Sequence, residues 1–295
     1  MKEFVGHWYA IPLRTTRMSI LVFISVMVAA LLHAAWNALV KNGVDKQAGM
    51  LLLTLGHAFF GLCLIPFFSI PTGQVWLWLL ASGVIHSFYQ LFLGFAYERG
   101  DLSRVYPIAR GGAPVIVLVA SLFFGIDSLG LFDLIGILVV GLGILLLGLG
   151  VFRLDEDRKL IPLALGSAFA IAGYSIVDGM GARIKGDAFA YVSWTLVFSA
   201  IFYVPAIFFI RGRSVFPQNR KQISLGFSVG GTSFIAYAIV VWAMTQAPIA
   251  LVTALRESSI LFAMLLGYFY FHDRMTLTKV LAGIAIVIGI ILTRL

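Results

Sequence analysis

The sequence predicts an all-helical integral membrane protein, with ten transmembrane helices arranged as two inverted five-helix repeats around a central cavity. Of its 295 residues, 61% are hydrophobic and only 12% are charged, and the mean hydropathy is +1.00. Soluble domains carry about a quarter charged residues, so this composition excludes an ordinary soluble domain. A disulfide scaffold is excluded as well, because the single cysteine, Cys63, has no internal partner. We expect Cys63 to be a small core residue.

Ten apolar segments follow one another along the chain, and each is long enough to cross the membrane. A helix needs about 20 residues to span a hydrocarbon core of about 30 Å. Continuous apolar runs such as 134–149 fit helices and lack the alternation of a transmembrane β-barrel. The ten segments are 19–40, 48–70, 74–97, 103–126, 130–151, 160–182, 187–210, 223–245, 249–271 and 276–293.

The largest charged cluster, residues 153–159, divides these segments into two sets of five. We therefore expect an N-terminal extension (1–18), a first repeat (19–152), a charged linker (153–159) and a second repeat (160–295). Because five is odd, the two repeats would have opposite orientations in the membrane. Inverted repeats usually place a substrate site at their interface, near the bilayer midplane.

Basic residues near the segment ends indicate the orientation of the chain. Cytoplasmic loops carry an excess of Lys and Arg. The basic residues fall into two groups, one at each membrane surface, and the larger group is on the surface opposite the N-terminus. We therefore expect both termini outside and the loop 211–221 in the cytoplasm. The smaller group has six members, Lys2, Arg14, Arg17, Arg183, Lys185 and Arg294, and the larger has thirteen, Lys41, Lys46, Arg99, Arg104, Arg153, Arg158, Lys159, Arg211, Arg213, Arg220, Lys221, Arg274 and Lys279. The net charge of +8 is spread over these short breaks, which favours contact with lipid headgroups and not with nucleic acid.

Polar side chains recur at helical spacing on several otherwise apolar segments, which predicts a polar cavity between them. A charge at the bilayer centre costs about 2.5–3.5 kcal/mol unless it is paired or lines a wet cavity. The alternative is that these groups only pack, through interhelical hydrogen bonds worth under about 1–2 kcal/mol each. The candidate cavity residues are His33, Trp36, Asn37, His86, Gln90, Tyr97, Tyr106, Arg110, Tyr174, Asp178, Tyr237, Trp242, Arg256 and Glu257.

A shift of 147 residues aligns the two halves and places Arg110 on Glu257. We expect these two residues to form an ion pair near the repeat axis, serving either as a gate or only as a structural link. Pro107 and Pro114, which flank Gly111 and Gly112, would supply a hinge in the fourth helix.

The fifth and tenth segments have no charged or amide side chains over 134–149 and 280–292, so we expect two peripheral helices. Glycines such as Gly141, Gly143 and Gly148 would provide their packing contacts. Pro248 would mark the start of the ninth helix.

Three segments carry a family resemblance: His33-Ala-Ala-Trp36-Asn37-Ala-Leu-Val-Lys41, Arg99-Gly-Asp-Leu-Ser-Arg104-Val-Tyr-Pro107-Ile-Ala, and Phe271-His-Asp273-Arg274-Met-Thr before a glycine-rich last helix. They resemble the ten-helix EamA branch of the drug/metabolite transporter superfamily, and the chain is similar to bacterial aromatic and neutral amino acid exporters. The resemblance implies a cavity lined by helices 1, 3, 4, 6, 8 and 9. It also implies transport of metabolites or amino acids, often export, by alternating access. Many members read Gly-Glu where this chain has His272-Asp273.

The chain lacks a phosphate-binding Gly-x-x-x-x-Gly-Lys-Ser/Thr loop and any recognisable catalytic constellation. We therefore expect neither ATP-driven pumping nor an enzyme, and no cofactor. The intramembrane histidines His33, His57 and His86 lie on three different segments, and we expect no metal site.

These observations predict a secondary transporter of small metabolites, foremost amino acids or related compounds, that exports its substrate across a bacterial inner membrane. Arg110 or Arg256 would bind a carboxylate, and Asp178 or Glu257 an amine. Asp178, Glu257 and the histidines could take up coupling protons. The expected partners are a small-molecule substrate and the lipid bilayer, and the protein would be a monomer or homodimer. The alternatives are a carrier of another class of compound, such as drugs or sugars, and a non-transporting membrane protein such as a sensor or assembly partner.

Overall fold

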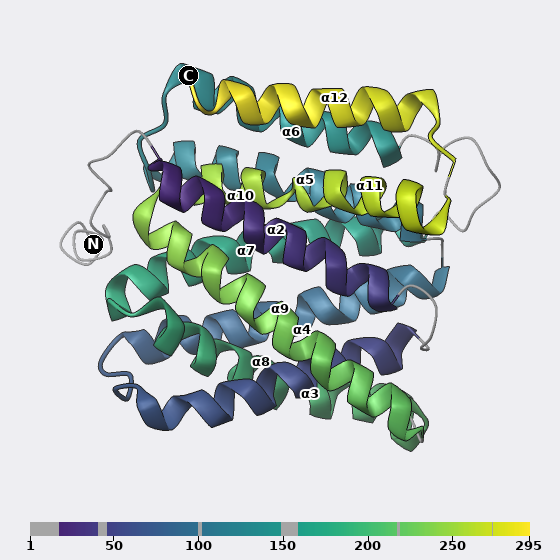
Figure 1. The fold of residues 1–295 in the computed structure, drawn as a ribbon. Coiled ribbons are helices and arrows are strands. Elements are labelled where there is room, and N and C mark those ends of the chain that lie inside the picture. Colours follow the sequence, from purple (N-terminus) through teal and green to yellow (C-terminus); the bar gives the residue numbers. More distant parts are fainter. Residues whose placement is uncertain (1–17, 41–45, 100–101, 149–158, 217–218, 273) are drawn as a thin grey trace.

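The computed structural model describes residues 18–40, 46–99, 102–148, 159–216, 219–272 and 274–295, and regular structure in these ranges is helical throughout (Figure 1). The predicted N-terminal extension up to residue 17 and the linker up to residue 158 lie outside them. The helices are α2 (Ile20–Val40), α3 (Lys46–Leu64), η1 (Ile65–Phe67), α4 (Val75–Arg99), α5 (Leu102–Phe124), α6 (Leu131–Gly148), α7 (Leu160–Lys185), α8 (Ala188–Arg211), η3 (Gly212–Val215), α9 (Arg220–Gln246), α10 (Ile249–Arg256), α11 (Ser259–Phe271) and α12 (Leu277–Leu292).

Nine spans within the described residues are long and apolar enough to cross a membrane, α10 and α11 together forming one of them. The last helix, α12, is apolar but shorter. The predicted all-helical membrane class is therefore confirmed.

The helices form a bundle in which α2 begins and α12 ends on the same side (Figure 1). Their contacts are reciprocal between the first five helices and the last five. From the first half, α4 packs on α7 and α8 of the second half; from the second half, α9 packs on α2 and α3 of the first half. Likewise α5 packs on α7, whereas α10 and α11 pack on α2. An inverted repeat would produce this exchange, although the boundaries of the two repeats remain a prediction.

The helices α6 and α12 lie together at the edge of the bundle, as expected for two peripheral helices (Figure 1). Glycine permits their close approach: a Cβ atom at Gly143 would lie 2.8 Å from Cβ of Ala285. Two further glycines of α6 face α5, where Gly141 meets Val115 and Gly148 meets Ile108. The predicted packing through these three glycines is confirmed.

The ninth span differs from the continuous helix that the sequence predicts. It begins after Pro248, as expected, but α10 ends at Arg256 and α11 starts only at Ser259. The hydroxyl of Ser258 donates to the carbonyl of Leu255 at 2.7 Å, and such local side-chain bonds compete with the helical pattern. By contrast, α5 is continuous through Pro107 and Pro114, so the interruption lies in the second half and not at the expected hinge.

The second span is also shorter than predicted, because α3 ends at Leu64 and a short 3₁₀ turn containing Pro66 follows. Near this end Cys63 is exposed, and the expectation that it is a core residue is wrong. Apolar runs cannot distinguish a core-facing from a lipid-facing position, since lipid-exposed surface is as apolar as the core. Such surface is extensive on α2, where Leu21 and Ile24 are among the exposed large residues.

The count of basic residues predicts that the end of the bundle at which α3 finishes faces outside. In a Cys63→Ser background, which has no other cysteine, we expect Thr72→Cys to react with a membrane-impermeant maleimide in intact spheroplasts. At the opposite end, Arg213→Cys should react only after permeabilisation. Both positions are exposed. The reverse labelling pattern would place both termini in the cytoplasm.

Candidate functional site

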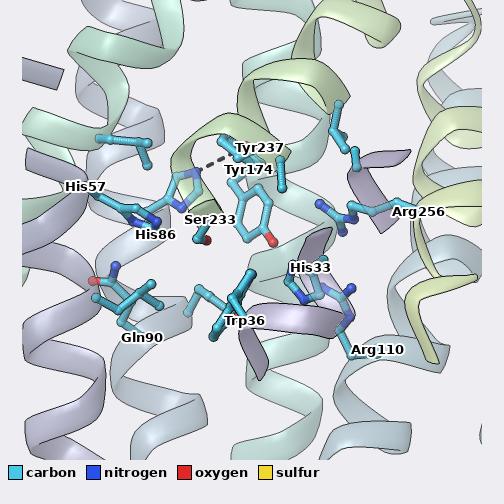
Figure 2. A pocket seen from close by; sticks show the side chains of 16 residues that line it. His33, Trp36, His57, His86, Gln90, Arg110, Tyr174, Ser233, Tyr237 and Arg256 are labelled. Carbon is cyan, nitrogen blue, oxygen red and sulfur yellow. Dashed lines mark hydrogen bonds between the residues drawn. The ribbon is translucent and has the colours of Figure 1, made fainter. Parts of the chain in front are cut away.

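A cavity of about 70 Å³ lies inside the bundle, enclosed by helices of both halves (Figure 2). Many of its lining residues fall near the middle of their helices, such as Tyr174 in α7 and Ser233 in α9, although Trp36 lies nearer the end of α2. The cavity therefore lies at mid-depth in the membrane. Ligand pockets usually measure about 300–1,000 Å³, so this conformation is contracted. The lining residues are Ala29, His33, Trp36, Leu53, His57, His86, Tyr89, Gln90, Arg110, Tyr174, Leu196, Ser233, Ala236, Tyr237, Val240 and Arg256.

Two arginines share one glutamate at one end of the cavity. The Nε atom of Arg110 lies 2.7 Å from Oε2 of Glu257, and Nη2 of Arg256 lies 3.3 Å from Oε1 of the same carboxylate. All three side chains are buried. The predicted ion pair between Arg110 and Glu257 is therefore confirmed. Because two cations face one anion, this end of the cavity keeps a positive charge.

Neighbouring side chains hold the two guanidinium groups in place. Arg110 donates from Nη2 to the hydroxyl of Ser259 at 3.2 Å, and its guanidinium carbon lies 5.4 Å from the ring centre of Tyr106. Arg256 lies 5.9 Å from the ring centre of Tyr174. Cations at this distance from an aromatic face are attracted to it. His33 lies on the same side of the cavity as both arginines (Figure 2).

A second polar cluster is centred on Asp178, which is fully buried. Its Oδ2 atom lies 2.9 Å from Nε2 of His86 and also accepts a hydrogen bond from the hydroxyl of Tyr237. Tyr191 donates to Oδ1 at 3.4 Å. The ring of His86 stacks on Tyr174, with centroids 4.1 Å apart. His86 and Tyr237 line the cavity, and Asp178 stands behind them.

One end of the bundle is tied by a buried network around Asp127, in the loop between α5 and α6. Arg183 at the end of α7 donates to Asp127 Oδ1 at 2.8 Å and to the carbonyls of Met244 and Ala247. The other carboxylate oxygen accepts from the backbone of Ile249 at 2.7 Å. This network joins the two halves of the chain at the end where α5, α7 and α9 finish.

The opposite end of the bundle is joined differently. There Arg211 of α8 pairs with Glu98 of α4, and these side chains are 41% and 30% exposed. In the Asp127 pair, by contrast, the arginine is 8% exposed and the carboxylate is fully buried. Exposed ion pairs contribute about 0–1 kcal/mol, so the described contacts tie the Asp127 end more firmly than the Arg211 end.

Comparison with known proteins assigns the second half of the chain. Residues 158–295 match the model of the EamA-like transporter family. The second half is an EamA-like transporter domain. The predicted resemblance to the drug/metabolite transporter superfamily is thereby confirmed.

Two further comparisons concern a relative and the overall fold. A riboflavin transporter of Rhizobium johnstonii (strain DSM 114642 / LMG 32736 / 3841) is 31% identical over 109 residues, a match that spans 35% of this chain and only 36% of that relative. A protein of known crystal structure superposes with a TM-score of 0.72 at 16% identity, over 95% of this chain and 99% of the other. At this identity the structural match shows the fold alone.

The cavity lies between the EamA-like domain and the first half of the chain. The domain supplies Tyr174, Tyr237 and Arg256, whereas the first half supplies His86 and Arg110 among others. The two ionic clusters cross the same boundary, because Glu257 and Asp178 belong to the domain, whereas Arg110 and His86, with which they pair, belong to the first half. A site at the interface of two halves is the arrangement found in transporters built from inverted repeats.

Most of the candidate residues are brought together around the cavity. His33, Trp36, His86, Gln90, Arg110, Tyr174, Tyr237 and Arg256 line it. Three others support these: Asp178 and Glu257 pair with lining residues, and Tyr106 underlies Arg110.

The structure does not bring the remaining three candidates into the lining. Asn37 donates to the carbonyl of His33 within its own helix at 2.7 Å. Tyr97 and Trp242 pack against the hydrophobic core.

His57, Tyr89 and Ser233 also line the cavity but are absent from the candidate set. Tyr89 directly precedes Gln90, and His57 is one of three intramembrane histidines, so residue type offered a signal for both. On its own helix His57 has only Thr54 as a nearby polar neighbour at helical spacing, and no charged or amide side chain at that spacing. Ser233 lies four residues before the candidate Tyr237, but serine is so common in membrane helices that its residue type gives no signal.

Replacement of Glu257 by glutamine would leave Arg110 and Arg256 buried without a carboxylate. Removing one partner of a buried ion pair costs about 3–5 kcal/mol, so we expect Glu257→Gln to lower the midpoint temperature of unfolding in detergent sharply. Glu98→Gln is the matched control and should lower it far less, because its partner Arg211 is half-exposed. Equal midpoints for the two variants would contradict a structural role for the buried pair.

Proposed function

We propose that the protein is a secondary transporter of small metabolites that carry a carboxylate, foremost amino acids and related compounds. One observation supports this most strongly: Arg110 and Arg256 share the single carboxylate of Glu257 beside a cavity at mid-membrane. Guanidinium groups bind carboxylates through charge-assisted hydrogen bonds. A substrate carboxylate would supply the anion that this cluster lacks.

The cavity offers less to the amine of a zwitterion. Asp178 is held by His86, Tyr191 and Tyr237, and Glu257 is engaged by two arginines. Neither carboxylate belongs to the lining. The geometry thus supports the carboxylate half of the expected amino acid recognition and assigns no acidic partner to the amine.

Transport would proceed by alternating access, with the two halves rocking about the cavity. The Asp127 network closes one end in this conformation, and substrate would enter from the other. Because the chain carries no ATP-binding loop, solute or ion gradients would supply the energy. Export across a bacterial inner membrane, as the family resemblance implies, completes the proposal.

Riboflavin is a second candidate substrate, supported by the relative of that name. The aromatic side chains of Trp36, Tyr89, Tyr174 and Tyr237 line the cavity and could stack on a planar ring system. Riboflavin has no carboxylate for the arginines, and the cavity would have to expand greatly to hold it. It therefore belongs in any substrate panel as the competing hypothesis.

Flux in proteoliposomes tests the proposal. We expect saturable uptake of at least one labelled amino acid from a panel that also contains riboflavin. Arg256→Gln should raise the half-saturating concentration of a carboxylate substrate by about tenfold or more, because a hydrogen bond to a charged group is worth about 1.5–3 kcal/mol. Arg213→Gln, which removes an exposed arginine in η3, beyond the end of α8 and away from the cavity, should leave it unchanged.

Saturable flux of riboflavin alone would replace the proposed substrate class. No saturable flux of any compound by well-folded protein would favour the alternative of a sensor or assembly partner.

Asp178 is the residue we propose for proton coupling. Glu257 is balanced by arginines, but the groups facing Asp178 are His86, Tyr191 and Tyr237, with Tyr174 stacked on His86. All of these groups can be neutral, so protonation of Asp178 would leave no buried cation without a counter-charge. His86, which lines the cavity, would pass the proton to it.

We expect Asp178→Asn to lose uptake driven by a proton gradient while substrate exchange without a gradient continues. Asp133→Asn is the matched control, because Asp133 is buried on the peripheral helix α6, and it should retain both activities. Gradient-driven uptake by Asp178→Asn vesicles would remove Asp178 from the coupling pathway.

A further inference from the structure

Apart from Arg110, whose Nε pairs with Glu257, three polar side chains around the cavity carry buried atoms without a hydrogen-bond partner among the described residues. They are Nε1 of Trp36, both ring nitrogens of His57 and Oε1 of Gln90. His57 and Gln90 are only 8% and 3% exposed. All three side chains line the same cavity, and His57 and Gln90 lie on the side away from the arginines (Figure 2).

Leaving a buried donor or acceptor unpaired costs about 1–3 kcal/mol. Other buried atoms of this kind, including Nε1 of Trp194 and the hydroxyls of Ser121, Ser167 and Tyr203, belong to residues that do not line the cavity. A ligand cannot satisfy those, but one in the cavity can satisfy Trp36, His57 and Gln90 together. Because these three side chains line the same cavity, one bound ligand could form hydrogen bonds with all of them.

The hydrogen-bonding capacity of these atoms defines what they would accept. Trp36 offers a donor only, Gln90 Oε1 is an acceptor only, and a neutral His57 offers one of each. The amide nitrogen of Gln90 already uses one of its two N–H groups, which donates to Ser199 Oγ at 3.2 Å. A complementary group must therefore both donate and accept hydrogen bonds.

This requirement excludes two common charged groups from that side of the cavity. An ammonium group donates only, so Trp36 would stay unpaired, and no carboxylate in the lining would balance its charge. A carboxylate accepts only, so Gln90 Oε1 would stay unpaired. The remaining chemistry is an uncharged group with both functions, such as a carboxamide, a hydroxyl, or a ring with N–H beside an acceptor.

We infer that Trp36, His57 and Gln90 form a specificity subsite for such a neutral donor–acceptor group at the far end of the substrate. The inference rests on the proposed function, because it assumes that the arginine cluster holds the carboxylate of the same molecule. It narrows the substrate class to small organic acids with a polar, uncharged opposite end. Acids whose opposite end is apolar are the compounds that this subsite rejects.

Three matched pairs of acids test the subsite by direct binding to purified protein in detergent: glutamine with methionine, asparagine with leucine, and tyrosine with phenylalanine. We expect wild-type protein to bind the polar member of at least one pair about tenfold or more tightly than the apolar member. His57→Phe and Gln90→Leu should abolish that preference and leave the affinity for the apolar member unchanged. Gln246→Leu, an exposed glutamine at the end of α9, is the control and should keep the preference.

Trp36→Phe provides a milder variant in case His57→Phe does not fold. Its matched control is Trp194→Phe, which removes an equally unpaired indole nitrogen outside the cavity. The preference should fall in Trp36→Phe and persist in Trp194→Phe.

Equal affinity for both members of every pair, or a preference that survives in His57→Phe and Gln90→Leu, would overturn the subsite. Binding and flux of acids without discrimination would do so while leaving the proposed function intact. If folded protein binds none of the six acids, the subsite assignment fails, and the flux panel then decides separately whether another carboxylate is carried.

Discussion

The structure depends on the cost of placing two arginines at mid-depth in a membrane. A buried cation persists only when an anion accompanies it, and for Arg110 that anion is Glu257, from the other half of the chain. The two halves must therefore meet face to face at this point. The interruption between α10 and α11 lies at the same residues, so the local backbone and the ionic cluster form one unit. The cavity lies beside this contact, between the two halves of the chain.

The sequence contained much of this fold because the membrane imposes length and hydropathy on every span. The helical class, the edge position of α6 and α12 and the pairing of Arg110 with Glu257 all follow from such constraints. Charge pairing was predictable because few ionisable residues occur inside spans, and each needs a partner. The packing glycines were predictable for a similar reason, since small residues mark close helix contacts.

Features that depend on side-chain direction were harder to predict. Cys63 and Trp242 stand in apolar sequence, which looks the same whether a position faces lipid or core. Asn37 lies on a polar stripe, yet its amide is satisfied by its own helix. His57 has only Thr54 as a polar neighbour at helical spacing, so the fold is needed to show that it lines one cavity with His86 and Gln90. The break after Arg256 was missed because Ser258 is unremarkable until its hydroxyl bonds to the backbone.

The buried network of Asp127 and Arg183 makes the two faces of the protein unequal. A ligand that reaches its site in only a fraction of molecules binds with an apparent dissociation constant equal to the intrinsic value divided by that fraction. In the proposed transport cycle the Asp127 end is closed in this conformation, so that fraction would be small for ligands arriving from there. The half-exposed pair at the other end is also weakened by salt. The proposed transporter would therefore bind its substrate with a higher apparent affinity from the Arg211 side of the membrane than from the Asp127 side, although the binding contacts are the same.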